Sequence, residues 1–436
     1  MLIIRWGRYV KQIRFKTRSL ILNGSIKTKP ALIGHMTYST DKDRFHYLDT
    51  VRASALLGGI LLHAIMNYLP GYRECNWPFS DNSTNAGLGI LYFIIHLFRM
   101  PLFFLIAGFF ARLLRQRLGT KGLIKNRLRR IGLPLIAFYF LVMPLGFLAF
   151  IWAARQLGTS GMGGTPKMDL PPVIGPFVPW GHLWFLYLLL VIYLLVLAAR
   201  ATVVSFDTEG TLRSTISRLL DSAFRLRIAP LLLGAPIALS LFLSPWWVQW
   251  QGIPSPIIGL VPNFPGLLAY GAAFLVGWFL HREQENLRVL ASDWHLYAVG
   301  AVAGTAVALY VVGIAPTLRI VELDNVDRAV YAGAYLFAQW CGMFAVIGFA
   351  ARYLRAPSRR WRYLADASYW MYLIHAPIIF LLQTWMLRWP LHWSIKLSMI
   401  LAITSVLLLT SYHYLVRTTF MGVFLNGRKY PRLSGN

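Results

Sequence analysis

Acidic side chains are scarce in this sequence of 436 residues, which has 16 Asp and Glu against 43 Lys and Arg. All sixteen fall in polar segments or at the edges of long apolar stretches. Transporters coupled to protons or sodium usually keep carboxylates near the membrane midplane, so their absence there weakens that class of function. Two cysteines, Cys75 and Cys341, lie far apart in the sequence, which excludes a disulfide framework and a cysteine metal site.

Charge of either sign is also low, because charged residues make up 14% of the chain and hydrophobic residues 57%, with a mean hydropathy of +0.54. Soluble domains contain roughly 45–50% apolar and about 25% charged residues. This composition excludes a disordered chain, a fibrous protein and an ordinary cytosolic enzyme. The excess of apolar residues must face lipid.

Ten apolar stretches are long enough to cross a bilayer, since a spanning helix needs about 20 such residues. They lie near 48–69, 88–111, 131–153, 183–203, 229–247, 264–281, 295–315, 330–350, 369–388 and 394–416. The stretch 229–247 is the weakest, because it holds three prolines. The runs are continuous rather than alternating, which disfavours a closed barrel. The predicted fold class is therefore an all-α polytopic membrane protein with about ten transmembrane helices.

The basic residues fix an orientation for these helices through the positive-inside rule. With the N-terminus inside, inside segments carry 34 Lys and Arg and outside segments carry 6. Both termini are therefore predicted to be cytoplasmic. Topology and lipid headgroups account for most of the net charge of +27, so nucleic acid is not an expected partner.

Three segments follow: a basic cytoplasmic N-terminal segment (1–46), a ten-helix domain (47–416) and a basic cytoplasmic tail (417–436). Residues 1–46 lack the apolar core and cleavage site of a signal peptide. Residues 2–22 interleave basic and apolar side chains, which is typical of an amphipathic segment on an anionic leaflet. A disordered basic tail explains the same composition equally well.

Ionisable residues inside spans are functional candidates, because they are costly to bury in lipid. Arg52 and His63 are eleven residues apart on one face of the first span, with Arg52 at the cytoplasmic end. His96 and Arg99 are neighbours at i and i+3 in the second span. The remaining candidates are the basic run Arg127, Arg129 and Arg130, the pair His182 and Trp184 that opens the fourth span, and Tyr372 and His375 in the ninth.

Each candidate has a simpler structural explanation. Arg52 could extend to the headgroups or pair with Asp49 one turn earlier. The basic run of Arg127, Arg129 and Arg130 could act only as a topology determinant. Trp184 could belong to the interfacial aromatic belt. His375 could serve packing through a hydrogen bond to a neighbouring helix.

The chemistry of the candidates indicates group transfer across a bilayer. Histidine is the usual general base near neutral pH, and guanidinium groups suit phosphate and carboxylate. A basic cytoplasmic mouth fits a phosphorylated donor, and an outward-reaching His63 fits an acceptor from the other side. Acyl transfer from a coenzyme A thioester is one such case. The residues alone leave acyl, glycosyl and phosphoryl transfer open.

An ordered set of motifs resembles the membrane acyltransferase 3 family. It begins with the Arg-x10-His pattern of Arg52 and His63 and continues through 95–100, 103–108, 127–134, 182–186 and 368–375. The His-x-x-Arg-Met and His-Leu-Trp-Phe segments resemble the branch that succinylates osmoregulated periplasmic glucans. One departure is Ala107, where the family often has serine before the glycine of the second-span motif.

The resemblance implies an acyl-CoA-dependent O-acyltransferase of the bacterial inner membrane that moves an acyl group, succinyl in our prediction, to hydroxyls of a periplasmic glucan. It implies His63 as the essential histidine and Arg52 as the essential arginine of its motif, while we assign oxyanion stabilisation to Arg99 or to an amide nearby. The residues expected to bind substrate or acyl-CoA are Arg127, Arg129, Arg130, His96, His182, Trp184, Tyr372 and His375. Acyl-CoA, carrying succinyl or acetyl, is the co-substrate, and we expect neither a metal nor a permanently bound cofactor.

Several alternatives stay open from sequence. The acyl group could pass directly to the acceptor or through an acyl-histidine. No acidic partner of His63 is evident, and the outer-side candidates are Glu322, Asp324 and Asp327. A secondary transporter or flippase for an anionic metabolite and a non-catalytic partner in a glucan-synthesis complex are the competing functions. Expected partners are acyl-CoA, a glucan and the bilayer, with a second copy of the chain as a further candidate.

Overall fold

The computed structural model describes residues 45–156, 168–427 and Tyr430. The predicted N-terminal segment 1–46 therefore lies almost entirely outside the described residues, as does most of the end of the tail. The described chain is helical, and its extended pairing is limited to two isolated bridges, Ile174 with Val261 and Pro179 with Ile258. The all-α prediction is confirmed.

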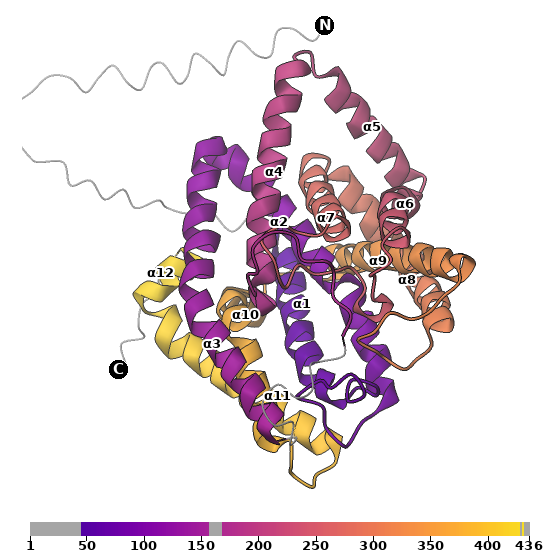
Figure 1. Ribbon diagram of the computed structural model, residues 1–436. Coiled ribbons are helices and arrows are strands. Elements are labelled where there is room, and N and C mark those ends of the chain that lie inside the picture. The colour runs from indigo at the N-terminus through magenta and orange to yellow at the C-terminus, as the bar shows by residue number, and fades with distance from the viewer. Residues whose placement is uncertain (1–44, 157–167, 428–429, 431–436) are drawn as a thin grey trace, which may run out of the picture. The chain divides into compact units, whose positions relative to one another are not determined.

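The helices follow one another along the chain (Figure 1). The α-helices are α1 (His46–Ile65), α2 (Ala86–Arg127), α3 (Leu133–Gln156), α4 (Trp184–Phe206), α5 (Thr211–Arg225), α6 (Ala229–Phe242), α7 (Phe264–Arg282), α8 (Glu285–Val312), α9 (Asn325–Tyr353), α10 (Arg359–Met386), α11 (Trp393–Ser411) and α12 (Phe420–Asn426). Short 3₁₀ turns are η2 (Met66–Tyr68), η4 (Gly181–Leu183) and η5 (Gln249–Gln251), and π-helical turns are η3 (Leu128–Gly132) and η6 (Tyr412–Arg417).

Eight helical runs in the described residues are long and apolar enough to span a membrane, or nine if α5 and α6 count as one broken span. One of the eight, Ala86–Gln156, contains 71 residues and holds both the second and the third predicted span. At 1.5 Å per residue it would extend about 107 Å if straight, more than three times the hydrocarbon thickness. It is instead interrupted at Gly119, whose φ of 70° is readily adopted only by a residue without a Cβ.

The fifth predicted span, 229–247, is wrong in its bounds. Helix α6 has 14 residues, too few to cross a bilayer, and ends at Phe242 before Pro245. It forms a bent pair with α5 at an angle of 110°. Helix α5 lies in a segment that the sequence analysis assigned to a cytoplasmic connection.

Polar side chains fix where several helices begin by accepting a hydrogen bond from a free backbone N–H of the first turn. Asn85 does this for α2, Asn263 for α7, Asp324 for α9 and Ser358 for α10. Asp324, one of the acidic candidates, is thus engaged at the start of α9, where its Oδ1 accepts from the N–H of Asp327 at 2.8 Å.

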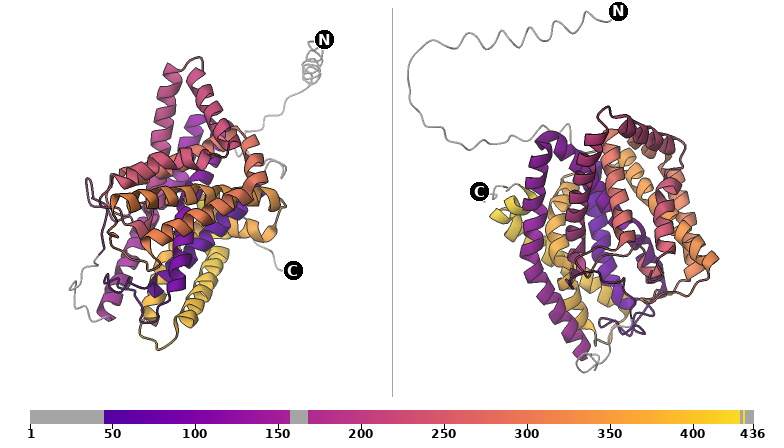
Figure 2. Two further views of the ribbon diagram at one scale, coloured as in Figure 1. Left: turned by 90° about the vertical axis from the view of Figure 1, so that its right-hand side faces the viewer. Right: turned by 45° about the horizontal axis from the view of Figure 1, so that its top comes forward.

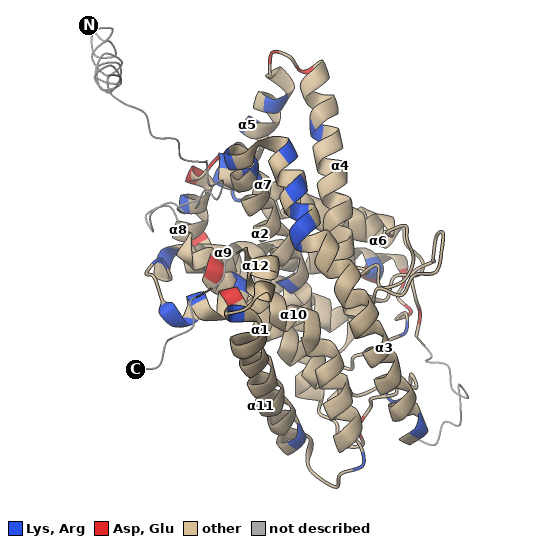
Figure 3. Ribbon diagram, turned by 90° about the vertical axis from the view of Figure 1, so that its left-hand side faces the viewer, with Lys and Arg blue, Asp and Glu red and all other residues tan. Residues whose placement is uncertain are grey.

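Helix α1 lies inside the bundle, where it packs against α2, α9, α10 and α11 (Figure 2). Helices α8 and α9 pack along each other on one side, and α3 packs against α10 on the other. Lys and Arg gather mainly towards helix ends and connections (Figure 3). The cytoplasmic placement of both termini remains a prediction from the charge distribution.

Two glycines bring α2 and α7 into backbone contact. A Cβ on Gly108 would lie 1.9 Å from the carbonyl oxygen of Phe274, and one on Gly277 would lie 1.8 Å from that of Leu105. Small residues allow this close approach, and the resulting van der Waals packing favours association of helices within a bilayer. The contact fixes α2, and with it Arg99, relative to the rest of the bundle.

Candidate active site

Arg52 is held at the start of α1 by two partners. Its Nη2 donates a hydrogen bond to the carbonyl oxygen of Ala365 on α10 at 2.9 Å and lies 3.3 Å from Oδ1 of Asp49. The pairing with Asp49 that the sequence left open is therefore present. The hydrogen bond to Ala365 ties Arg52 to α10, and Asp49 offsets part of the charge of Arg52.

Arg99 of α2 packs onto the bare backbone of α1 at Gly59. A Cβ on Gly59 would lie 2.1 Å from Nη1 of Arg99, so a residue with a side chain would displace the guanidinium. Gly59 precedes His63 by four residues, which places both on one face of α1. The Arg99 guanidinium thus lies about one helical turn below His63, and its buried Nε has no hydrogen-bond partner in the structure.

His63 lies near the C-terminal end of α1, where the helix leaves backbone carbonyls without intrahelical partners. Gln383 of α10 satisfies two of them, because its Nε2 donates to the carbonyl oxygens of His63 at 2.9 Å and Ala64 at 3.2 Å. The His63 ring is half-buried, its Nδ1 is buried without a partner, and Phe380 packs edge-on against it at 6.2 Å between centroids.

Three imidazole rings form a row between α1, η4 and α10. The ring centroids of His63 and His375 are 5.2 Å apart, and those of His375 and His182 are 5.4 Å apart. Arg99 and His96 are also close enough to act electrostatically on His63. His375 is thus the neighbour of His63, for which the sequence shows no evident acidic partner. No group of three ligating side chains within the described ranges could hold a metal ion.

Backbone carbonyls fix the tautomers of two of these rings. The Nδ1 of His375 lies 2.8 Å from the carbonyl oxygen of Tyr372 and 3.1 Å from that of Met371. A carbonyl only accepts, so Nδ1 carries the hydrogen and the buried, unpartnered Nε2 of the neutral ring has a free lone pair. His182 is oriented in the opposite sense, with Nε2 donating to the carbonyl oxygen of Leu373 at 3.1 Å.

Tyr372 and Trp184 belong to the wall around this row. The Tyr372 hydroxyl donates to the carbonyl oxygen of His182 at 2.7 Å, which ties α10 to η4. Trp184 is buried against Tyr270 and Phe104, with ring centroids 5.2 Å and 6.3 Å away. It is therefore packed inside the protein, and its role in substrate binding stays a prediction. His96 stacks on Tyr92 of its own helix at 5.3 Å.

The three arginines predicted to line one mouth point in different directions. The Arg127 guanidinium lies 5.3 Å from the ring centroid of Tyr193 on α4, and that of Arg130 lies over Gly427 beyond α12. Arg129 is exposed. The π-helical turn η3 (Leu128–Gly132) changes the angular spacing of these residues, and the Tyr369 hydroxyl donates to the Arg130 carbonyl oxygen at 2.7 Å.

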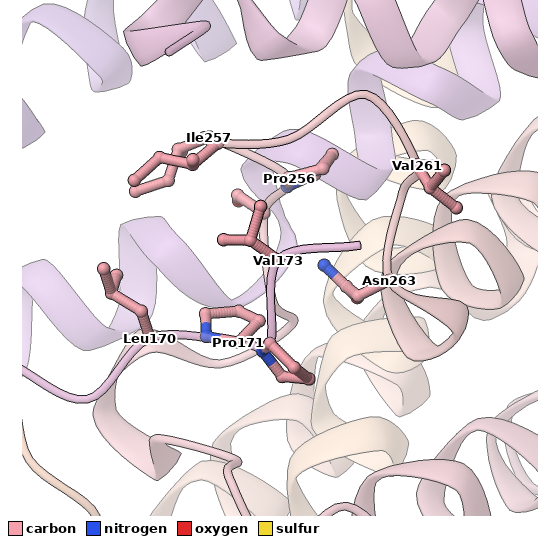
Figure 4. Close-up of a pocket in the computed structure, with 10 residues that line it drawn as sticks. Leu170, Pro171, Val173, Pro256, Ile257, Val261 and Asn263 are labelled. Carbon is pink, nitrogen blue, oxygen red and sulfur yellow. The ribbon is translucent and has the colours of Figure 1, made fainter. Parts of the chain in front are cut away.

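A separate pocket lies between the loop that precedes η4 and the loop that precedes α7 (Figure 4). Its lining is mostly apolar and comes from 170–173, 255–258, Val261 and Asn263. The Asn263 amide is already engaged, since Nδ2 donates to Pro254 at 3.2 Å and Oδ1 accepts from Gly266 at 2.8 Å. The residues that line this pocket include none of the candidate catalytic residues.

Sequence reasoning missed Gly59 and Gln383, which position the two central side chains. Gly59 carried a signal, since it lies between Arg52 and His63 on the same helical face. Gln383 carried none, because its role depends on a contact across 320 residues of chain.

The fold and the site together define a multi-pass helical membrane protein with a row of imidazoles and a guanidinium in its interior. The sequence model of the acyltransferase domain of the acyltransferase 3 family matches residues 45–412, and the chain belongs to this family.

Curated relatives include glucans biosynthesis protein C of Shigella dysenteriae serotype 1, which is 30% identical over 152 residues, and that of Escherichia coli K12, which is 28% identical over the same length. Each match covers 34% of this chain, and the chain spans only 37% of the length of these relatives. No solved structure matches the chain.

Proposed function

We propose that this protein transfers a succinyl group from cytoplasmic acyl-CoA to hydroxyls of a periplasmic glucan across the bacterial inner membrane. The observation that carries the proposal is the position of the Arg99 guanidinium over Gly59, one turn from the His63 ring on the same face of α1. The names of the relatives, which refer to glucan biosynthesis, support the acceptor class.

The proposed reaction is direct attack of a sugar hydroxyl on the thioester. The unprotonated His63 nitrogen accepts the hydroxyl proton as the oxygen bonds to the thioester carbon. Arg99 lies one turn away and stabilises the negative charge that develops on the carbonyl oxygen. The C–S bond then breaks, and the departing CoA sulfur takes the proton from His63. An ester and free CoA result, and His63 returns to its starting state.

Arginine also suits a succinyl donor, because the free carboxylate of the succinyl group can accept two parallel hydrogen bonds from a guanidinium group. An acetyl group has no such carboxylate. A route through an acyl-histidine would use the same residues, with His63 attacking the thioester first.

The decisive test uses His63→Ala, with His295→Ala as its control because His295 is an exposed histidine on α8 outside the site. A strain lacking the native protein receives each variant, and mass spectrometry of its periplasmic glucans records succinyl or acetyl substituents. We expect no acylated glucan with His63→Ala and normal acylation with His295→Ala, at equal amounts of membrane-inserted protein.

Unimpaired acylation by His63→Ala would end the assignment of His63. A purified protein that moves an anionic metabolite across vesicles, without forming a new ester, would establish the transporter instead. Release of CoA from succinyl-CoA by the purified wild type, absent in His63→Ala, would exclude a purely structural role.

A further inference from the structure

Helices α2, α4 and α7 run side by side in the same direction through their contact region. Gly108 of α2 meets Phe274 of α7, and the ring centroids of Phe274 and Tyr193 of α4 are 5.0 Å apart. Further along, the Arg112 guanidinium lies over Trp278 at 5.8 Å, and the rings of Phe109 and His281 are 4.9 Å apart. Residues beyond this level on the three helices therefore emerge together at one end of the bundle.

Four arginines occupy that level, and none belongs to the predicted site. Arg115, Arg200 and Arg282 follow the contact residues of their helices by seven or eight positions, which is about 10–12 Å at 1.5 Å per residue. Arg112 lies one turn before Arg115 on the same face. We call these residues the arginine cluster (Arg112, Arg115, Arg200 and Arg282).

The charges of the arginine cluster act on one another, with Arg282, Arg115 and Arg200 all opposing the charge of Arg112. The Glu283 carboxylate acts in the opposite sense on Arg112, and it pairs with Arg282 at 2.9 Å while accepting from Ser217 at 3.1 Å. The Nε of Arg112 is buried without a hydrogen-bond partner.

Membrane topology accounts for basic residues at this end of the bundle, and so does the negative end of a helix dipole. Neither effect accounts for the placement of Arg112, whose buried Nε has no hydrogen-bond partner and whose charge is opposed by arginines at the same level of all three helices. Like charges repel one another. A bound polyanion would offset this repulsion and would accept the hydrogen bond that Nε of Arg112 lacks.

We propose that the arginine cluster binds the phosphates of the nucleotide portion of the acyl-CoA donor. The inference rests on the proposed function and gives it the phosphate site that Arg127, Arg129 and Arg130 do not form together. Arg112 follows Arg99 by thirteen residues on α2, about 20 Å along the axis. An extended pantetheine arm spans such a length, so phosphates at the arginine cluster leave the thioester within reach of Arg99 and His63.

The test measures CoA binding by calorimetry, with the full-length protein in nanodiscs of neutral lipid. Arg115→Gln and Arg200→Gln should each weaken CoA binding about 10-fold or more, because each removes charge-assisted hydrogen bonds. Dephospho-CoA should bind the wild type more weakly than CoA, and both affinities should fall with salt. Arg115→Lys should retain part of the affinity, because it keeps the charge but loses the fork.

The control is Arg288→Gln, since Arg288 is exposed on α8 and pairs with Glu285 at 2.8 Å. It should bind CoA as the wild type does. Unchanged CoA affinity in Arg115→Gln and Arg200→Gln, with melting temperatures equal to the wild type, would overturn the proposal.

The phosphate of a lipid headgroup could bind the arginine cluster in the same way as the phosphates of CoA. A second experiment distinguishes these two ligands. Nanodiscs with phosphatidylglycerol are analysed by native mass spectrometry. Lipid retained by the wild type and lost from both glutamine variants, with CoA affinity unchanged, would assign the arginine cluster to headgroups instead. If CoA affinity falls in these variants while His63→Ala still acylates glucan, the phosphate site stands and the catalytic assignment fails.

Discussion

Replacing Gly59 with alanine should separate the proposed transferase activity of this protein from its stability. The new Cβ would lie 2.1 Å from Nη1 of Arg99, whereas ordinary contacts begin near 3.4 Å. The guanidinium must therefore move by more than 1 Å, and a misplacement of about 1 Å costs roughly 100-fold in rate. Alanine should meanwhile stabilise α1 by about 1 kcal/mol relative to glycine.

Gly58→Ala is the matched control, because the Cβ there meets Cγ2 of Ile95 at an ordinary 3.6 Å and helix propensity changes equally. The assay follows release of CoA from succinyl-CoA in the presence of glucan, and thermal unfolding in the same detergent gives stability. We expect kcat to fall about 100-fold in Gly59→Ala alone, with the melting temperature unchanged or higher in both variants. Equal rates in the two variants would refute the role given to Arg99.

Three further predictions concern the supports of the site. Asp81→Asn should lower the free energy of unfolding by about 3–5 kcal/mol, because it leaves the buried Lys396 ammonium, which lies 2.7 Å from the Asp81 carboxylate, without its charged partner. A melting temperature within about 1–2 °C of the wild type would contradict this. Gly277→Ala should lower the melting temperature sharply, since its Cβ would lie 1.8 Å from a backbone oxygen of α2, whereas Gly271→Ala, with nothing within 4 Å, should not. Gln383→Leu should reduce kcat more than stability, because the carbonyls at the end of α1 lose their donor; an unchanged kcat would exclude a positioning role.

The class of fold and the shared helical face of Arg52 and His63 could be predicted from the sequence, because both depend on local periodicity. Long apolar runs require helices, and the spacing of Arg52 and His63 places them on one face of α1 whatever surrounds it. The bent pair of α5 and α6 was missed because hydropathy does not distinguish a continuous helix from two short ones joined at a turn. Three prolines in 229–247 were the available signal.

The details of the site depended on contacts that no local pattern contains. The directions of Arg127 and Arg130 follow from the π-helical turn η3, whereas an α-helical spacing would have kept their side chains as neighbours. The row of His63, His375 and His182 joins segments from three parts of the chain, and only the family resemblance grouped them.

The backbone contact between α2 and α7 limits how the bundle can open. Gly108 and Gly277 leave no layer of side chains between the two helices, so neither helix can slide or rotate against the other without a clash of main-chain atoms. The pair must move as one unit. Under the proposed function, any widening that lets a sugar or a thioester reach Arg99 takes place on the opposite side of α2, where α1 and α10 are held by side-chain hydrogen bonds that can break and re-form.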